Sequence, residues 1–328
     1  MTILVTGSAG HLGEAILRTL RARGMAARGI DLKPSAFTDA TGSIVHAGFV
    51  RAQMKDVTSV LHTATLHKPH VATHSKRDFI DTNVTGTLNL LEAAVAAGVR
   101  SFVFTSTTSA FGSMLKPDTG GAAVWVTEEL PSVPKNIYGT TKLMAENLCE
   151  LFFREHRLPV IVLRTSRFFP EDDDDPVARA SYVLDNAQAN ELLYRRLDIE
   201  DAVTAHLLAS KKAGEIGFAR YIVSATSPFT QRHLAALPRD AAGVVRKLYP
   251  ECDSLYARRG WRLFDEIDRV YVNDRARREL GWQPRFDFAH VLNSLRAERD
   301  FRSELARQVG AKGYHDAVFD DGPYPVAS

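Results

Sequence analysis

The feature that most constrains the fold is a glycine-rich turn close to the start of the chain. A short apolar, β-branched run at residues 2–6 leads into Gly7, Gly10 and Gly13, after which apolar residues recur at helical spacing. Such glycines allow a sharp turn, the approach of a pyrophosphate to the main chain, and close helix–strand packing. The free N–H groups of the helix N-terminus favour phosphates. We therefore predict a dinucleotide site that includes Gly7, Gly10, His11, Leu12 and Gly13.

A second predicted strand, residues 27–30, ends at Asp31, eighteen residues beyond Gly13. A carboxylate at this place can accept hydrogen bonds from the adenosine ribose and would repel a 2′-phosphate. The sequence thus favours NAD. Arg28 and Lys33 lie close to Asp31 in the sequence, and they keep NADP open as an alternative.

Strand and helix patterns alternate through the first two thirds of the chain. Further strands are predicted at residues 43–46, 59–65, 101–105, 160–163 and 221–223. This alternation predicts an α/β fold with a doubly wound parallel sheet of the Rossmann type, whose ligands bind at the carboxyl ends of the strands.

The composition limits the kinds of molecule that the protein is expected to bind. With 41 basic and 39 acidic residues the formal charge is +2, which indicates neither a nucleic-acid footprint nor a membrane-surface patch. No apolar run approaches the ~20 residues of a spanning helix. Two cysteines far apart, Cys149 and Cys252, suit a reducing compartment. We expect a cytoplasmic protein with a small polar substrate, no nucleic acid and no membrane.

Three histidines, His67, His70 and His74, follow the strand predicted at residues 59–65. Their spacing allows a metal site in principle. No carboxylate or thiol is close in sequence, however, and Pro69 interrupts a regular helix. We predict no metal and instead expect His67 to contact a polar or anionic substrate.

Tyr138 and Lys142 begin a predicted helix at residues 138–156 and project from one face of it. A nearby ammonium favours the phenolate and would lower the pKa of Tyr138, which could then act as a general acid/base. Hydroxyl side chains at residues 105–109 lie at the end of a strand, where one of them could bind a substrate oxygen.

Taken together, these motifs resemble a known family. The glycine turn, Asp31, the Asn83-Val84-Thr85-Gly86-Thr87 helix, Phe104-Thr105-Ser106-Thr107 and the Tyr138/Lys142 pair occur in the order and spacing of extended short-chain dehydrogenases/reductases. Within them the chain is similar to the NAD-dependent epimerase/dehydratase family, and the likeness extends to the tail at residues 269–284.

The resemblance implies a hydride-transfer site. Tyr138 would be the acid/base, Lys142 would lower its pKa and bind the nicotinamide ribose, and Thr107 would hold the reacting oxygen. The resemblance also implies a homodimer through the helices at 79–97 and 138–156. Residues 1–165, with returning segments at about 197–225, would form the NAD-binding domain. About 166–196 and 226–328 would form a smaller substrate-binding lobe. Further positions that match the family's cofactor lining are Thr63, Ala64, Asn83, Ser106 and Ser166.

The departures from the family concern the substrate. His46 stands where the family commonly has an aspartate near the adenine. Thr108-Ser109 replaces the Asp-Glu pair of dehydratases, which argues against elimination of water. Only about thirty residues separate Arg167 from Leu197, fewer than nucleotide-sugar enzymes use to enclose a uridine diphosphate. Arg167 could clamp a carboxylate or phosphate, or form a structural ion pair with the acidic run at 171–175.

Three functions remain open from the sequence. The first is an NAD-dependent oxidoreductase acting at a hydroxyl/carbonyl carbon of a sugar, sugar acid or similar small polar substrate. The second is a nucleotide-sugar 4-epimerase of the UDP-hexose type with retained NAD, and the third is a non-catalytic NAD-binding regulator.

Overall fold

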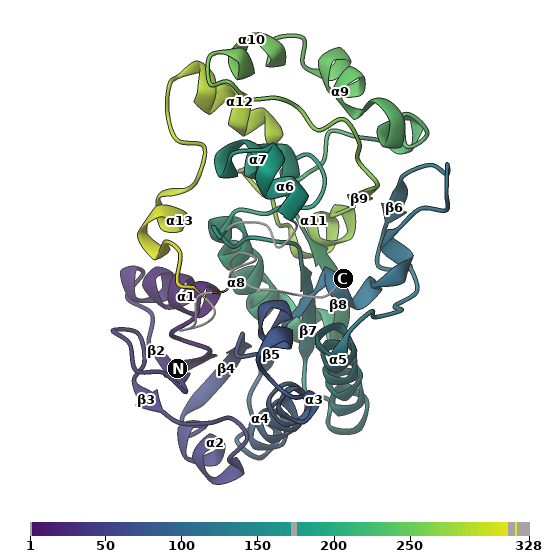
Figure 1. Cartoon of the computed structure of the whole chain (residues 1–328). Coiled ribbons are helices and arrows are strands. Elements are labelled where there is room, and N and C mark those ends of the chain that lie inside the picture. Colours follow the sequence, from purple (N-terminus) through teal and green to yellow (C-terminus); the bar gives the residue numbers. More distant parts are fainter. Residues whose placement is uncertain (1, 172–175, 314–318, 320–328) are drawn as a thin grey trace.

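The structure, a computed structural model, describes residues 2–171, 176–313 and 319. Its centre is a seven-stranded parallel sheet in the order β3-β2-β1-β4-β5-β7-β8 (Figure 1). This order confirms the predicted doubly wound Rossmann-type fold, with strand order reversing beside β1. The strands are β1 (Thr2–Thr6), β2 (Ala27–Asp31), β3 (Ala40–Thr41), β4 (Val57–His62), β5 (Ser101–Thr107), β7 (Val160–Thr165) and β8 (Phe218–Val223).

Helices cover both faces of the sheet, and each face has its own apolar core. The strands are almost wholly buried apolar runs, as expected of a parallel sheet packed on two sides. One face carries α1 (His11–Ala22), α8 (Ile199–Ile216), α11 (Asp274–Leu280) and α13 (Glu304–Val309). The other carries α2 (Ala47–Gln53), α3 (Lys76–Phe79), the π-helix η2 (Ile80–Thr85), α4 (Gly86–Ala96) and α5 (Ile137–His156).

A separate apolar cluster lies beyond the carboxyl ends of the strands, at the top of Figure 1. It includes a two-stranded parallel ribbon of β6 (Val124–Val126) and β9 (Arg269–Tyr271), which sequence patterns did not predict. Its helices are α7 (Leu184–Glu191), α9 (Leu237–Leu248), α10 (Cys252–Ala257) and α12 (Phe288–Arg296), and the short α6 (Pro176–Ser181) precedes α7 in the chain. The exact division of the chain into a cofactor domain and a substrate lobe stays a prediction.

The predicted third strand at residues 43–46 is wrong. The strand that pairs with β2 is the shorter β3, which ends two residues before the predicted strand begins. The carbonyl groups of Ile44 and Val45 instead accept hydrogen bonds from Asn89 Nδ2, and the Ile44 side chain is buried against Gly86. These apolar residues therefore fill the space beside α4 rather than extend the sheet, and His46 precedes α2 instead of ending a strand.

Two other predicted elements have different bounds. The fourth strand, predicted at residues 59–65, spans Val57–His62, so Thr63 and Ala64 lie in the loop that follows it. The long helical stripe after residue 79 is interrupted by η2, a π-helical stretch that contains Asn83. Such stretches are rare and often lie at functional sites. Among the described residues, none of the helices is long and apolar enough to cross a membrane.

Candidate functional site

The glycine turn between β1 and α1 has the close contacts that the sequence predicted. Gly7 has φ +74°, and a Cβ on Gly13 would lie 2.0 Å from the Gly7 carbonyl oxygen. Gly10 precedes the first turn of α1 in extended conformation, so the N–H groups of that turn point out of the helix end. The turn thus forms a tight cradle at the N-terminus of α1, in which a Cβ at position 7 or 13 would collide with the neighbouring backbone. The Leu12 side chain is in the core, so Leu12 can contribute to such a site only through its backbone.

Asp31 closes the other side of this turn. Its Oδ2 accepts a hydrogen bond from Ala9 N at 2.9 Å, and its Oδ1 accepts one from Lys33 N at 2.9 Å. Each oxygen keeps a second lone pair for a further donor. The carboxylate is therefore held at the end of β2 by two backbone groups, next to the glycine turn.

His11 makes contacts that sequence reasoning missed. Its Nε2 lies 2.7 Å from Glu171 Oε1, and its ring centre is 5.5 Å from that of Phe169. The backbone N–H of Lys312 donates to both His11 Nε2 and Glu171 Oε1. The segment after β7 and the segment after α13 therefore meet above the N-terminus of α1. The partners are 160 and 301 residues from His11, so no local pattern could reveal them.

Thr63 and Ala64 are held against β1 by Thr6. Their N–H groups donate to Thr6 Oγ1, and Thr63 Oγ1 donates to the Thr6 carbonyl at 2.6 Å. A Cβ on Gly7 would lie 2.8 Å from Ala64 N, so the glycine permits this approach. Thr6 Oγ1 is also 2.7 Å from Nδ1 of the buried His62. Residues 63–64 thus border the glycine turn, and their role in lining a cofactor stays a prediction.

The Asn83 side chain holds the loop after β4 instead of facing an open site. Its Oδ1 accepts hydrogen bonds from Thr65 Oγ1 and Leu66 N, and its Nδ2 donates to Leu66 O and Thr141 Oγ1. These four bonds use the full capacity of the amide. The predicted contact of this side chain with a cofactor is therefore not supported, and its role is to position the loop and α5.

Tyr138 and Thr107 are brought together where α5 begins beside the end of β5. A Cβ on Gly139 would lie 2.8 Å from the Ser109 carbonyl oxygen, so this glycine allows the close approach of the two elements. Burial raises the pKa of Tyr138 to about 12, while a side-chain hydrogen bond with Thr107 lowers it. Thr107 Oγ1 also accepts from Ser109 N at 3.1 Å. The Tyr138 phenol and the Thr107 hydroxyl can therefore both hydrogen-bond to one reacting oxygen of a substrate.

Lys142 lies one turn after Tyr138 and is buried. Its Nζ is 4.1 Å from the centre of the Phe104 ring. Burial lowers the pKa of Lys142 to about 7, against the opposing effect of Glu146. The expectation that Lys142 lowers the pKa of Tyr138 is not met, because burial dominates at both residues and favours their neutral forms.

Beneath Lys142 lies a buried ionic network that the sequence analysis did not identify. Glu146, fully buried, accepts hydrogen bonds from Ser106 Oγ at 2.5 Å, Arg164 Nη2 at 2.7 Å and Arg220 Nε at 3.1 Å. The predicted cofactor-lining Ser106 is thus tied through its hydroxyl to the helix that carries Tyr138 and Lys142. The network fixes α5 to β5, β7 and β8.

Ser166 directly follows β7 and has a buried hydroxyl. Its Oγ has no hydrogen-bond partner among the described residues. An unsatisfied buried hydroxyl is unfavourable unless a ligand or water binds it. This residue therefore fits its predicted place in a ligand site.

His67 lies between the reaction centre and the segment after β7. Its ring centre is 6.5 Å from that of Tyr138, 5.3 Å from that of Phe169 and 4.7 Å from that of His70. His74 stacks edgewise on His70 at 5.2 Å. Within the ranges that the structure describes, no group of three or more His, Cys, Asp or Glu side chains is arranged to hold a metal ion.

Arg167, predicted to contact substrate, lies 3.9 Å from Glu191 through its Nη1. Its backbone pairs with Arg196, and its carbonyl accepts from Leu197 N. Glu191 is thus one ionic partner of Arg167. Of the acidic run at 171–175, the partner considered from the sequence, Glu171 pairs with His11 and residues 172–175 lie outside the described residues.

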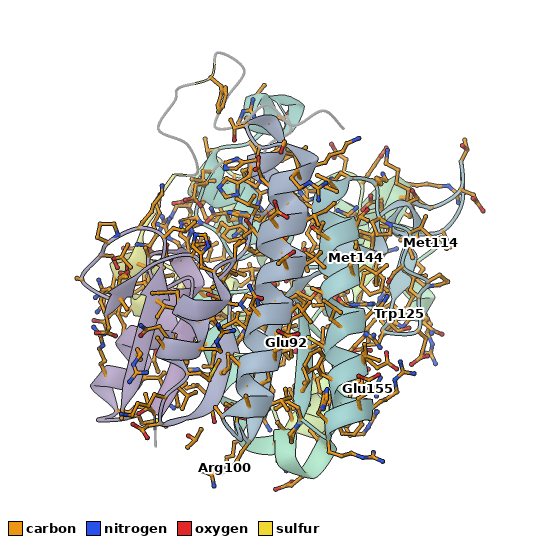
Figure 2. All side chains as sticks on the ribbon, turned by 90° about the horizontal axis from the view of Figure 1, so that it is seen from below. Glu92, Arg100, Met114, Trp125, Met144 and Glu155 are labelled. Carbon is orange, nitrogen blue, oxygen red and sulfur yellow. The ribbon has the colours of Figure 1, made fainter. Side chains whose placement is uncertain are left out.

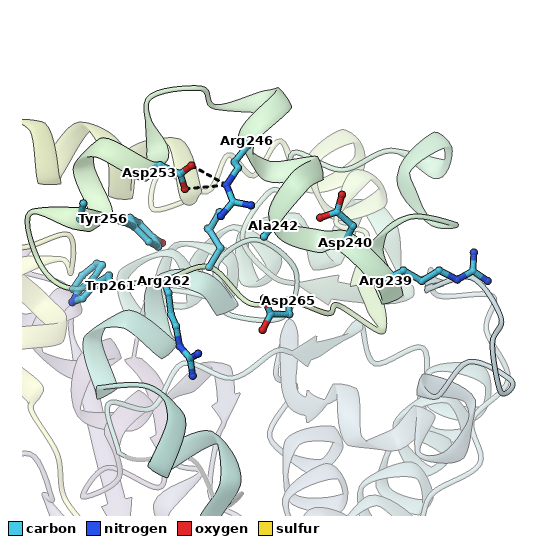
Figure 3. Close-up of a pocket in the computed structure, with 11 residues that line it drawn as sticks. Arg239, Asp240, Ala242, Arg246, Asp253, Tyr256, Trp261, Arg262 and Asp265 are labelled. Carbon is cyan, nitrogen blue, oxygen red and sulfur yellow. Dashed lines mark hydrogen bonds and ion pairs between the residues drawn. The ribbon is translucent and has the colours of Figure 1, made fainter.

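Two cavities lie away from Tyr138. One, of about 390 Å³, extends from His11 past Phe168 and Phe169 to α7 and α13 and is lined mainly by apolar side chains. The other, of about 300 Å³, lies between α9 and α10 (Figure 3). There Arg246 and Asp253 pair at 2.8 Å. Neither cavity is lined by Thr107, Tyr138 or Lys142.

A protein-family model matches the first two thirds of the chain. Residues 3–219 match the model of the NAD dependent epimerase/dehydratase family. The chain is 26% identical to a UDP-glucose 4-epimerase of Azospirillum brasilense, covering 95% of both chains. It is 27% identical to a dTDP-glucose 4,6-dehydratase of Streptomyces antibioticus, covering 92% of this chain and 94% of that one.

Solved structures show the same fold. A short-chain dehydrogenase/reductase superfamily protein of Agrobacterium tumefaciens with bound NAD is 25% identical and superposes with a TM-score of 0.65, covering 94% of this chain and 99% of that chain. A UDP-glucose 4-epimerase of Thermotoga maritima with UDP-glucose, 21% identical, gives a TM-score of 0.62 over 91% of this chain and 99% of that chain.

Proposed function

The chain belongs to the NAD-dependent epimerase/dehydratase family, and we propose that it is an NAD-dependent oxidoreductase. It transfers hydride at a hydroxyl- or carbonyl-bearing carbon of a sugar, sugar acid or similar small polar substrate. The observation that carries this proposal is the meeting of Thr107, Tyr138 and Lys142 at the carboxyl end of β5. Ligands of doubly wound sheets bind at this edge.

The residues at this edge fit a dinucleotide. The Gly7–Gly13 cradle presents the backbone N–H groups at the uncapped N-terminus of α1 to a pyrophosphate, and Asp31 retains acceptors for a ribose diol. The unsatisfied hydroxyl of Ser166 and residues 63–64 would line other parts of the cofactor. NAD, when bound, supplies the hydride acceptor for oxidation of the substrate.

Proton transfer is the task of the chain's own side chains. With a pKa near 12, Tyr138 keeps its phenolic proton at neutral pH and can donate it to a carbonyl oxygen. Lys142, with a pKa near 7, gains and loses a proton at neutral pH. In the oxidation direction Tyr138 must first give up its own phenolic proton, and neutral Lys142, one helical turn away, is a base that can accept it. Tyr138 can then take the hydroxyl proton of the substrate. Thr107 orients the reacting oxygen.

A nucleotide-sugar 4-epimerase is the second candidate. The Azospirillum relative is a UDP-glucose 4-epimerase, and the similarity covers 95% of its length, which supports this alternative. The short stretch between Arg167 and Leu197 favours a smaller substrate. A regulator that binds NAD without turnover is the third candidate. The combination of Thr107 with Tyr138 and Lys142 argues against it.

We further propose a homodimer formed through α4 and α5. The two helices lie side by side on one outer face of the molecule (Figure 2). Met144 is 42% exposed on this face, and Leu88, Val95 and Leu148 are only partly buried. Pairing with a second copy would bury these side chains in a four-helix bundle. The cytoplasmic location also stays a prediction.

The test is to follow NADH absorbance when the purified protein and NAD meet free sugars, uronic acids, polyols and UDP-hexoses. Net NADH with one small-molecule class supports the dehydrogenase and identifies its substrate. A UDP-hexose converted without net NADH, by protein that retains NAD through purification, would establish the epimerase instead. No reaction with any compound, despite NAD binding, would favour the regulator.

A further inference from the structure

A buried histidine joins the end of β1 to a helix on one face of the sheet. His62, the last residue of β4, is 1% exposed, and both of its ring nitrogens have a partner. Its Nδ1 lies 2.7 Å from Thr6 Oγ1, and its Nε2 lies 3.0 Å from Thr87 Oγ1. Thr6 directly precedes Gly7 of the glycine turn, whereas Thr87 is in the first turn of α4. One imidazole therefore connects these two parts of the molecule.

The hydrogen bonds of Thr87 determine which nitrogen of His62 carries the proton. Thr87 Oγ1 lies 2.7 Å from the Asn83 carbonyl oxygen, which can only accept, so the Thr87 hydroxyl donates its single proton there. His62 Nε2 must then donate to Thr87 Oγ1. Burial, and then the charge of Lys142, lower the pKa of His62 well below its usual value. The ring is therefore neutral, and its Nδ1 is an acceptor.

This tautomer sets the direction of the Thr6 hydroxyl. Because His62 Nδ1 accepts, Thr6 Oγ1 donates its proton to it and keeps two lone pairs. These accept the backbone N–H groups of Thr63 at 3.2 Å and Ala64 at 3.1 Å. Without an acceptor at His62 the hydroxyl is free to rotate, and a rotation that points its proton at the loop removes one of the two acceptor positions.

His62 also supports the far end of this loop, through Thr87. The Thr87 hydroxyl bonds to the backbone of Asn83, and the Asn83 side chain accepts a hydrogen bond from Leu66 N at 2.8 Å. Residues 63–66 are therefore held at both ends by hydrogen bonds that meet at one buried ring.

The loop is in contact with the glycine turn. A Cβ on Gly7 would lie 2.8 Å from both Ala64 N and Thr63 Oγ1, so a shift of the loop would change the wall of the turn. His62 itself is buried next to Phe104, with ring centres 5.5 Å apart. It can therefore act on a ligand of the turn only through the residues that it holds.

We propose that His62, as the tautomer with its proton on Nε2, is a positioning residue for NAD. It orients the Thr6 hydroxyl, which in turn holds residues 63 and 64 against the cofactor. This inference rests on the proposed NAD binding and adds a residue that does not touch the cofactor. An imidazole suits the task because it has an acceptor and a donor on one rigid ring.

A second buried histidine provides a matched control. His206 on α8 is fully buried, and its Nδ1 lies 2.7 Å from the Ala202 carbonyl oxygen, so Nδ1 carries the proton. Its Nε2 then accepts from Thr105 Oγ1 at 2.8 Å. His206 is thus the opposite tautomer, and these two partners are on α8 and β5 rather than in the loop at 63–66.

The test compares the wild type with His62→Leu, His62→Asn and His206→Leu. Leucine occupies the place of either imidazole but offers neither a donor nor an acceptor. Asparagine has its Oδ1 on Cγ, the carbon that carries Nδ1 in histidine, so it retains an acceptor for Thr6. Calorimetry measures NAD affinity, hydrogen–deuterium exchange follows the amides of residues 63 and 64, and urea denaturation measures stability.

His62→Leu should weaken NAD binding at least about fivefold, the effect of losing one buried hydrogen bond. It should also speed the exchange of the two amides, and His62→Asn should recover most of the affinity. His206→Leu should lose a comparable amount of stability while its NAD affinity stays near wild type. Imidazole nitrogen chemical shifts should show the proton on Nε2 in His62 and on Nδ1 in His206.

Thr6→Val tests whether His62 acts through Thr6. Valine keeps the shape of threonine but lacks the hydroxyl, so NAD affinity should fall to about the level of His62→Leu. Adding His62→Leu to Thr6→Val should then cost little more, because both changes remove the same interaction. Additive losses would contradict this path. Thr6→Val also keeps the test decisive if His62→Leu does not fold.

Three results would overturn the inference: equal losses of NAD affinity in His62→Leu and His206→Leu, an unchanged affinity in His62→Leu, or a proton on Nδ1 of His62. A wild type that binds no NAD would refute the proposed function, and the positioning of NAD would fall with it. Faster amide exchange in His62→Leu would in that case still identify His62 as the support of the loop.

Discussion

The Nζ atom of Lys142 lies 4.1 Å from the centre of the Phe104 ring, inside the protein. A cation above an aromatic face gains some stabilisation, but less than it loses by leaving water. Burial accordingly lowers the pKa of Lys142 to about 7. Lys142 should therefore make the free energy of unfolding depend on pH.

The sign of that dependence follows from proton binding. Between pH 7 and the lysine's ordinary value near 10.5, the unfolded chain holds a proton at Lys142 that the folded chain has released. The free energy of unfolding should rise with pH in this window, by up to about 1.4 kcal/mol per pH unit from this residue. Lys142→Met should lose that contribution. Urea unfolding at pH 7, 8 and 9 measures it, and parallel curves for the two proteins would contradict the account.

Glu146→Gln should destabilise the protein strongly. The change removes the carboxylate partner of Arg164, whose side chain is buried. Breaking a buried ion pair costs about 3–5 kcal/mol. Glu150→Gln is the matched control, since Glu150 is 38% exposed and pairs with Arg220 at the surface, and it should cost less than ~1 kcal/mol. Chemical denaturation compares the two, and similar losses would refute the special role of Glu146.

Gly13→Ala should disrupt the cradle. The new methyl group would lie 2.0 Å from the Gly7 carbonyl oxygen, so the turn must move. Gly214→Ala places the same methyl group in α8 where no atom lies within 4 Å, and it should stabilise that helix by up to ~1 kcal/mol. Calorimetric NAD affinity should fall at least tenfold in the first variant alone. An unchanged NAD affinity of Gly13→Ala would show that the cradle is not part of the cofactor site.

The elements predicted best from sequence are those whose signal is local. The glycine turn, β2 with Asp31, and the helix that begins at Tyr138 each have their pattern within about twenty residues. The tertiary structure then altered only their ends. The misplaced third strand shows the limit, because Ile44 and Val45 carry strand-like apolar side chains but their carbonyl groups bond to Asn89 of α4.

Side-chain partners far apart in the chain could not be predicted. Glu146 appears in the sequence as one more acidic residue on a helix, and only the fold brings Arg164 and Arg220 to it. The β6–β9 ribbon joins three-residue strands about 145 positions apart, too short for a periodic signal. The contact between His11 and Glu171 likewise joins residues that are far apart in the chain, so no local pattern predicts it.

Asp31 should determine the choice of cofactor. Asp31→Asn removes the charge that would repel a 2′-phosphate, and its amide oxygen can still accept from Ala9 N or from Lys33 N, although not from both through separate oxygens as the carboxylate does. We expect the ratio of kcat/KM for NADP over NAD to rise at least about tenfold, the effect of ~1.4 kcal/mol. Steady-state kinetics with each cofactor measures it, and an unchanged ratio would show that Asp31 does not face the ribose.

The most direct test of the central claim is turnover by Tyr138→Phe on the substrate that the NADH assay identifies. The variant loses one hydroxyl from a buried ring, so its fold and NAD affinity should persist. If Tyr138 transfers the proton, kcat should fall by about 10²- to 10⁴-fold, the usual contribution of a general acid/base. Turnover within a factor of two of wild type would contradict the assignment of Tyr138, and with it the proposed mechanism.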